Sequence, residues 1–197
     1  MNKAVVIIGG GPVGLIFALL NQINGLDTLI LESKSENQSL DDSRGLALSN
    51  GSRFILEEIG IWEELTDKLT EIKSIHTSQK GTFGRTLMQA KDFKKDALGY
   101  IVSYGSLIKV LQKKLKKSKK INILYNTKAS QLLLKKGENC LIYQDQRKKH
   151  ELFFDLLVLA DGGNACIPGI EITRSSKTFN HSAIVTQVVS EFPHQNI

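Results

Sequence analysis

Three glycines near the start of the chain, Gly9, Gly11 and Gly14, have the G-x-G-x-x-G spacing of dinucleotide-binding turns. The first glycine permits a tight turn, the second lets a diphosphate approach the backbone, and the third lets a helix lie close to a strand. Pro12 and Val13 stand where that helix would begin, and its free N–H groups and dipole favour an anion. We therefore expect these five residues to contact a cofactor, the alternative being a glycine-rich turn without a ligand.

A carboxylate follows at a separation that suits the ribose of such a cofactor. Glu32 lies 18 residues after Gly14, at the end of an apolar segment, and Ser33 comes directly after it. A carboxylate there accepts hydrogen bonds from both ribose hydroxyls and repels a 2′-phosphate. Glu32 and Ser33 therefore indicate a first nucleotide site for NAD or FAD, although a surface carboxylate at a strand end is an alternative explanation.

The elements that must position these residues can be outlined from the apolar pattern. Residues 3–8 and 27–31 read as buried strands around a helix at residues 12–24, which makes a βαβ unit. Residues 156–160 form an apolar run that ends at Asp161 and Gly162, as a central parallel strand would. Further elements are expected, namely helices at residues 49–59 and 62–69, strands at 72–78 and 82–89, a helix from 105 or 106 capped by Ser106, strands at 121–125, 129–134 and 140–145, and a last strand at 182–191.

Two further motifs separate FAD from NAD. Asp42 and Arg44, followed by Gly-Leu-Ala-Leu, resemble the D-x-R segment of the para-hydroxybenzoate hydroxylase superfamily, in which an arginine lies beside the flavin. Asp161 and Gly162 resemble the DG motif of the same superfamily, which touches FAD and the region used by NADPH. The order and spacing of all four motifs make this superfamily the leading interpretation.

Several stretches are similar to the ubiquinone-biosynthesis hydroxylases of that superfamily, which act on polyprenylated phenols, such as 2-octaprenyl-6-methoxyphenol. These are residues 44–48, 59–62, 75–76 with 80–81, 98–102 and 156–164. The resemblance implies an enzyme that binds FAD, takes electrons from NAD(P)H and uses O₂ to hydroxylate a small aromatic, prenylated ring. It implies Arg44, Asp161 and Gly162 as flavin contacts and gives no catalytic base.

The fold class implied is α/β, with a Rossmann-like FAD/NAD(P)-binding domain and the beginning of a β-sheet substrate domain. We expect residues 1–72 and 101–178 to form the FAD-binding domain, and residues 73–100 and 179–197 to belong to the substrate domain. The superfamily's second flavin motif, a GD, is not found after the DG, so we expect an N-terminal portion with its C-terminal half missing. Such a portion would associate with that half or with a second copy.

Two other functions stay open at this point. One is a residual nucleotide-binding module without turnover, and the other is an NAD-dependent oxidoreductase in which Arg44 and Asp161 have no special role. The net charge of +6 suggests a nucleic-acid partner, but seven lysines cluster at residues 109–120 without an aromatic residue for stacking. A solvated helix face is the better explanation, with attraction to an anionic membrane as the alternative.

The location expected is the cytoplasm, with peripheral association at the inner membrane face. Cys140 and Cys166 have no C-x-x-C spacing, which fits a reducing compartment and excludes a disulfide framework. The glycines interrupt the apolar segment at residues 4–20, which argues against a signal peptide or a membrane span. The four histidines lack ligand spacing, so no metal site is predicted.

Overall fold

The structure is a computed structural model of the whole chain. It describes residues 2–81, 83–135, 137–145, 148–163, 167–173, 175–179, 182 and 191, with the backbone alone at residues 2 and 3. The expected strand at residues 182–191 falls almost wholly outside these described residues.

The elements alternate between strands and helices in the first half, and the second half is dominated by strands. In chain order they are β1 (Asn2–Ile8), α1 (Pro12–Ile23), β2 (Thr28–Leu31), β3 (Gly45–Leu48), α2 (Asn50–Glu58), α3 (Trp62–Leu65), the 3₁₀ helix η1 (Thr66–Lys68), β4 (Thr70–Ile72), β5 (Ser74–Ser78), β6 (Arg85–Gln89), the 3₁₀ helix η2 (Ala90–Phe93), β7 (Gly99–Ser103), α4 (Tyr104–Leu115), β8 (Ile121–Leu124), β9 (Lys128–Lys135), β10 (Glu138–Gln144) and β11 (Lys149–Leu159).

The main sheet has six strands in the order β8-β2-β1-β11-β10-β9. Strands β8, β2, β1 and β11 run parallel, whereas β10 and β9 are antiparallel additions at one side. Strand β1 is central and fully apolar in its second half, from Val5 to Ile8, and β2 is buried along its whole length. The predicted α/β fold and the parallel position of the apolar run before Asp161 are therefore confirmed.

Two hydrophobic clusters cover the two faces of this sheet. Helices α1 and α4 lie on one face, where Leu15, Ile30 and Leu111 are among the buried residues. On the other face, Leu141, Leu152 and Ile167 join side chains of β1 and β2. The sheet is thus buried on both sides, as a parallel sheet requires.

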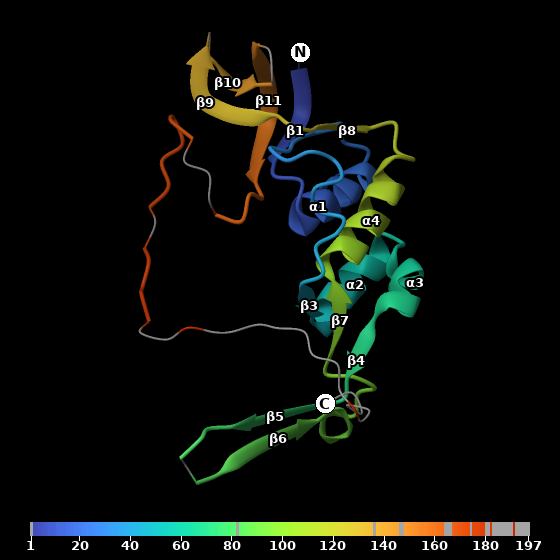
Figure 1. Cartoon of the computed structure of the whole chain (residues 1–197). Coiled ribbons are helices and arrows are strands. Elements are labelled where there is room, and N and C mark those ends of the chain that lie inside the picture. The colour runs from blue at the N-terminus through green and yellow to red at the C-terminus, as the bar shows by residue number, and fades with distance from the viewer. Residues whose placement is uncertain are drawn as a thin grey trace.

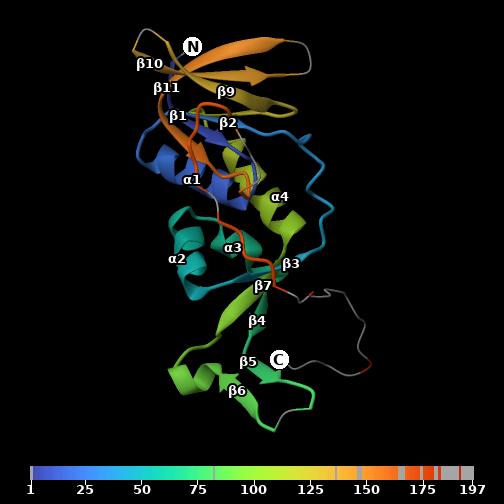
Figure 2. The same ribbon diagram turned by 90° about the vertical axis from the view of Figure 1, so that its left-hand side faces the viewer.

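The remaining strands form two small sheets away from the main one. Strands β3, β7 and β4 make a three-stranded antiparallel sheet, and β5 pairs only with β6. Figure 1 shows the main sheet at one end of an elongated molecule and the β5–β6 hairpin at the other, with α2 and α3 between them. Figure 2 shows the same separation after a quarter turn.

Several expected boundaries are wrong in instructive ways. The strand expected at residues 72–78 is two strands, because Lys73 separates β4, which pairs with β7, from β5, which pairs with β6. The helix expected at residues 62–69 tightens into η1 after Leu65. Strands β3 and β7 were not expected. Each is short, and each is a strand because it pairs with a segment far away in the sequence.

The start of α4 also differs from the expectation that Ser106 is its N-cap. Ser103 is the N-cap, and its hydroxyl accepts a hydrogen bond from the Ser106 backbone N–H at 3.2 Å. The helix therefore begins at Tyr104, one or two residues before the expected start at residue 105 or 106. The tyrosine is thus the first residue of the helix. The division of the chain into FAD-binding and substrate segments stays a prediction.

Candidate cofactor-binding site

The glycine turn follows β1 directly, and two of its glycines are required by neighbouring backbone. Gly9 has a φ of +108°, and a Cβ there would come within 2.4 Å of the Ala160 carbonyl oxygen. A Cβ at Gly14 would lie 2.0 Å from the Gly9 carbonyl oxygen and 3.3 Å from Ile7 Cγ2. Gly14 thus lets α1 approach β1, and Gly9 lets the turn pass beside the end of β11.

Gly11 is different, because the protein itself leaves room for a side chain there. A Cβ on Gly11 would make only an ordinary contact, 3.5 Å from the Tyr104 hydroxyl. Gly11 is the N-cap of α1 and precedes Pro12 at the first helical position, and no side chain among the described residues accepts a hydrogen bond from the first N–H groups of the helix as a cap. The first turn contains no acidic residue. The helix start therefore keeps N–H donors available to an anion, and the small residue leaves space for it.

Glu32 lies at the end of β2 and is bonded to the glycine turn. Its Oε2 accepts a hydrogen bond from the Gly10 backbone N–H at 2.6 Å. Its Oε1 accepts from the Lys34 backbone N–H at 2.7 Å and from the Ser33 hydroxyl at 3.3 Å. These bonds hold the carboxylate beside the turn, where its remaining lone pairs can accept hydroxyl groups of a ribose.

Arg44 lies at the end of a loop that precedes β3, and its side chain is 71% exposed. Its guanidinium donates to the Asp42 carboxylate through Nε at 3.0 Å and through Nη2 at 2.7 Å. This side-chain pairing lowers the pKa of Asp42 and raises the pKa of Arg44. Both groups are therefore charged at neutral pH, and Asp42 sets the orientation of the arginine.

Tyr104 joins the arginine to the glycine turn. The Arg44 guanidinium carbon lies 5.2 Å from the centre of the Tyr104 ring, within the range of a cation–π contact. The hydroxyl at the other end of the ring faces the Gly11 position. The structure thus brings the start of α1, Glu32 and Arg44 together through one tyrosine. Tyr104 was not predicted as a site residue, because only the folded chain places it beside Gly11.

Asp161 and Gly162 follow β11 at the same edge of the sheet as Gly9 and Glu32. The Gly9 Cα approaches the peptide that joins Ala160 to Asp161 so closely that a Cβ would lie 2.9 Å from the Asp161 nitrogen. The carboxylate of Asp161 accepts a hydrogen bond from the Gly163 N–H at 3.2 Å. Gly162 and Gly163 have positive φ angles of 73° and 80°, so the chain turns sharply there.

The carboxyl ends of β1, β2 and β11 therefore meet at one edge of the sheet and deliver the glycine turn, Glu32 and Asp161. Ligands of open parallel sheets bind at this edge. The contacts that these residues would make with a cofactor stay predictions, including those of Val13, whose side chain is 70% exposed.

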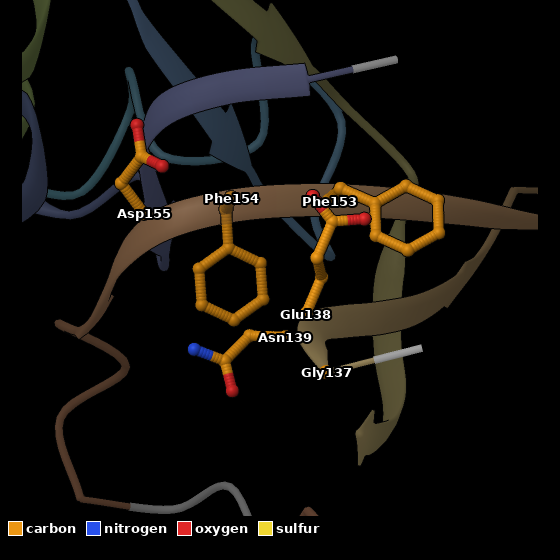
Figure 3. Close-up of a pocket in the computed structure, with 6 residues that line it drawn as sticks. All are labelled: Gly137, Glu138, Asn139, Phe153, Phe154 and Asp155. Carbon is orange, nitrogen blue, oxygen red and sulfur yellow. The ribbon is translucent and has the colours of Figure 1, made fainter. Parts of the chain in front are cut away.

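A pocket elsewhere on the molecule is less suitable. It is lined by residues at the beginning of β10 and in the middle of β11 (Figure 3): Gly137, Glu138, Asn139, Phe153, Phe154 and Asp155. It contains two carboxylates and no cationic side chain, so it is poorly suited to a diphosphate. We do not assign the cofactor to it.

Two other findings concern the described part of the chain. No helix there combines the length and apolar character needed to cross a membrane.

His150 is paired with Asp145, with Nε2 and Oδ2 2.8 Å apart, and it stacks on Tyr143. No sequence motif indicated this pair, because the β10–β11 hairpin brings together two residues that the sequence pattern did not connect.

The parallel strands, the glycine turn and the carboxylate at the end of β2 define a Rossmann-like nucleotide-binding domain. Residues 2–194 match the family described as the FAD binding domain, and the chain belongs to that family.

Several curated proteins are similar to this chain in sequence. An uncharacterized protein of Synechocystis is 28% identical over 163 residues, which are 82% of this chain and 39% of the relative. The FAD-dependent monooxygenase ntnA of Nectria is 29% identical over 61% of this chain and 16% of its own length. The ubiquinone hydroxylase UbiM of Neisseria meningitidis is 24% identical over 74% of this chain and 33% of its own length. The chain thus spans about two fifths or less of these relatives.

Solved structures show the same fold. The p-nitrophenol 4-monooxygenase PnpA of Pseudomonas putida has a TM-score of 0.67 and 19% identity, covering 82% of this chain and 41% of PnpA. The flavin-dependent monooxygenase PieE, solved with FAD and substrate, has a TM-score of 0.69 and 16% identity, covering 83% of this chain and 31% of PieE.

Proposed function

We propose that this chain is the FAD-binding part of a flavin-dependent aromatic monooxygenase. The observation that carries the proposal is the family match along nearly the whole chain, combined with a glycine turn whose helix start is free for a diphosphate. The names of ntnA and PnpA, both monooxygenases, support the reaction class.

In this proposal FAD lies along the carboxyl edge of the parallel strands. The diphosphate takes the N–H groups at the start of α1, beside Gly11, Pro12 and Val13. Glu32, assisted by Ser33, accepts the hydroxyls of the adenosine ribose. FAD supplies the electron transfer and oxygen chemistry when bound, and the protein binds it, orients it and excludes water.

Arg44, Asp161 and Gly162 are proposed to lie nearer the flavin ring. Asp42 holds the Arg44 guanidinium as a fixed positive charge, because a bidentate pair restricts the side chain. The positive φ of Gly162 turns the chain after Asp161, and the Asp161 carboxylate accepts a hydrogen bond from the Gly163 N–H within this turn. These residues are binding and orienting groups, and none is assigned as a base.

We further propose that the electron donor is NAD(P)H and that the substrate is a prenylated phenol of the quinone pathway. The resemblance to UbiM, at 24% identity, supports this branch. An aromatic substrate and O₂ are supported more broadly by the hydroxylases among the structural neighbours.

A prenylated substrate would partition into a membrane, so we propose that the enzyme works at an anionic membrane surface. Two exposed lysines after α4, Lys117 and Lys119, support this proposal, because they could contact anionic lipid. Lys113 and Lys116 are instead paired with Glu64 and Glu36. Flotation with vesicles containing anionic lipid would test it, and equal flotation with neutral vesicles would contradict an electrostatic contact.

The cofactor assignment is tested by titrating the purified chain with FAD and, separately, with NAD. We expect FAD to bind saturably, with a change in flavin fluorescence, and Gly11→Asp to abolish the change because its carboxylate would repel the diphosphate. Saturable binding of NAD without any binding of FAD would overturn the proposal in favour of an NAD-dependent oxidoreductase.

A further inference from the structure

Tyr104 is the one aromatic side chain that touches both the glycine turn and Arg44 among the residues that the structure describes. Its ring lies under the Arg44 guanidinium carbon at 5.2 Å, and its hydroxyl lies 3.5 Å from the position of a Cβ on Gly11. Gly11 is the N-cap of α1. The phenol oxygen is therefore next to the helix start that is free to bind an anion.

The start of α4, which carries the Tyr104 ring, is held by backbone contacts. The Tyr104 N–H donates to the Arg44 carbonyl oxygen at 2.8 Å, and the Gly105 N–H donates to the Asp42 carbonyl oxygen at 2.8 Å. A Cβ on Gly105 would lie 2.1 Å from the Leu40 carbonyl oxygen, so only glycine allows this approach. Because the start of α4 is held against the loop that carries Arg44, the ring needs little reorganisation to meet a ligand.

The hydroxyl is also suited to donate a hydrogen bond. Burial raises the pKa of Tyr104, and the negative charge of Glu32 adds to this effect. The phenol therefore stays protonated over the whole neutral and mildly alkaline range. A neutral donor beside an anion site forms a charge-assisted hydrogen bond, which is about twice as strong as a neutral one.

We propose that the Tyr104 hydroxyl donates a hydrogen bond to the diphosphate of the dinucleotide bound at the start of α1, while its ring keeps Arg44 beside the same ligand. The inference rests on the proposed function, because it requires a dinucleotide at that site. It adds a donor that the glycine turn lacks, since Pro12 has no N–H to offer at the first helical position.

The test compares ADP and adenosine as probes by calorimetry on the full chain, with the unmodified protein and Tyr104→Phe. Phenylalanine keeps the ring under Arg44 and removes only the oxygen. We expect Y104F to weaken ADP about 10-fold, the effect of one hydrogen bond to a charged group, and to change adenosine less than about twofold. Tyr143→Phe is the matched control, because Tyr143 also has a pKa raised by burial and lies on β10, away from the glycine turn.

A second measurement needs no variant. In a chain labelled with ¹³C at tyrosine Cζ, the Tyr104 resonance should shift on adding ADP and stay unchanged with adenosine. Equal ADP affinity of the unmodified chain and Y104F, or equal losses for ADP and adenosine, would overturn the role of Tyr104 alone. Absence of both ADP and FAD binding to the unmodified chain would overturn the proposed function and this inference together.

Discussion

The two ends of the molecule are held in different ways. At the carboxyl edge of the main sheet, a Cβ at Gly9 would overlap the backbone of Ala160 after β11, and a Cβ at Gly14 would overlap the Gly9 backbone after β1. At the other end, the β5–β6 hairpin pairs only with itself. Its glycines, Gly81 and Gly84, have no atom within 4 Å of an added Cβ, apart from their immediate neighbours in the chain.

The side chains show the same contrast. Val6 and Ile7 of β1 are fully buried, whereas Phe83 and Leu87 of the hairpin segment are 109% and 53% exposed. The edge that carries the candidate site is thus constrained by tertiary contacts, and the hairpin is constrained mainly by its own ladder of hydrogen bonds. A two-stranded hairpin alone is marginally stable in water, so substitutions at the two ends should have very different effects.

The largest effect is expected for Gly14→Ala. The added methyl would overlap the Gly9 carbonyl oxygen at 2.0 Å, so α1 must move away from β1 and the turn must distort. We expect a loss of about 3 kcal/mol in the free energy of unfolding and a complete loss of FAD binding. Urea denaturation and flavin titration measure the two effects.

Gly51→Ala is the matched control for this substitution. Gly51 lies in the first turn of α2, and its Cβ would make an ordinary 3.5 Å contact with the Ser49 hydroxyl oxygen. Alanine there should stabilise the protein slightly, by up to about 1 kcal/mol. Equal stability of G14A and the unmodified protein would show that the Gly9 carbonyl oxygen does not exclude a Cβ at position 14.

Much of this constrained end could be predicted from the sequence. The glycine spacing and the apolar runs at residues 3–8 and 156–160 each indicate a local structure, and parallel pairing places their ends at one edge. The role of Gly9 was only half predictable. Its turn follows from spacing, but its approach to Ala160 depends on which strand pairs with β1, and that is decided by a contact between residues far apart in the chain.

The position of Tyr104 shows what local pattern cannot supply. Ser106 and Ser103 both suit an N-cap, and choosing the wrong one moves the helix start away from the tyrosine. The helix begins at residue 104 because Ser103 ends β7, whose pairing with β3 fixes the chain there. Tertiary pairing thus decided a local boundary, and with it a member of the candidate site.

The next effect concerns Glu32, and two substitutions separate its structural role from its binding role. Glu32→Gln keeps one oxygen, which can accept the Gly10 N–H, but its NH₂ group cannot accept the Lys34 N–H. It also loses the charge that favours two ribose hydroxyls. Because the Lys34 N–H is exposed and water can replace the lost acceptor, we expect E32Q to lose less than about 1 kcal/mol of stability and to weaken FAD about 10-fold. Glu32→Ala removes the acceptor for Gly10 as well, and should also lose about 1 to 2 kcal/mol of stability.

The control for both variants is Glu138→Gln, an exposed carboxylate on β10, which lies three strands away from β2 in the main sheet. It should leave FAD affinity and stability unchanged. An E138Q protein that loses FAD affinity as much as E32Q would indicate that net charge, and not the position beside the glycine turn, governs binding.

A smaller effect is expected at high pH from Tyr125, which follows β8 near the same edge. Burial, with the charges of Glu36 and Glu32, raises its pKa to about 12. A raised pKa means that the folded state holds the proton more tightly, so the contribution is complete below about pH 10 and is lost as the pH rises toward 12. Because the side chain is partly exposed, the loss should stay below about 1 kcal/mol.

Denaturation of the unmodified protein and Tyr125→Phe at pH 8, 10 and 11 measures this contribution. The difference in unfolding free energy between the two proteins should shrink or reverse as the pH rises, because phenylalanine cannot ionise. A difference that stays constant from pH 8 to 11 would contradict the raised pKa.

The smallest effect is expected at the tip of the hairpin, for Phe83→Ser. The side chain is fully exposed, so replacing it removes almost no buried surface, and the free energy of unfolding should change by less than about 0.5 kcal/mol. Self-association should fall, because the hairpin segment exposes Phe83 together with Leu87 and Met88, and exposed apolar side chains favour contact between copies. Scattering at several concentrations, beside the denaturation curve, measures both. A loss of stability as large as that of G14A would show that the hairpin is packed against the rest of the protein, and the contrast between the two ends would then fail.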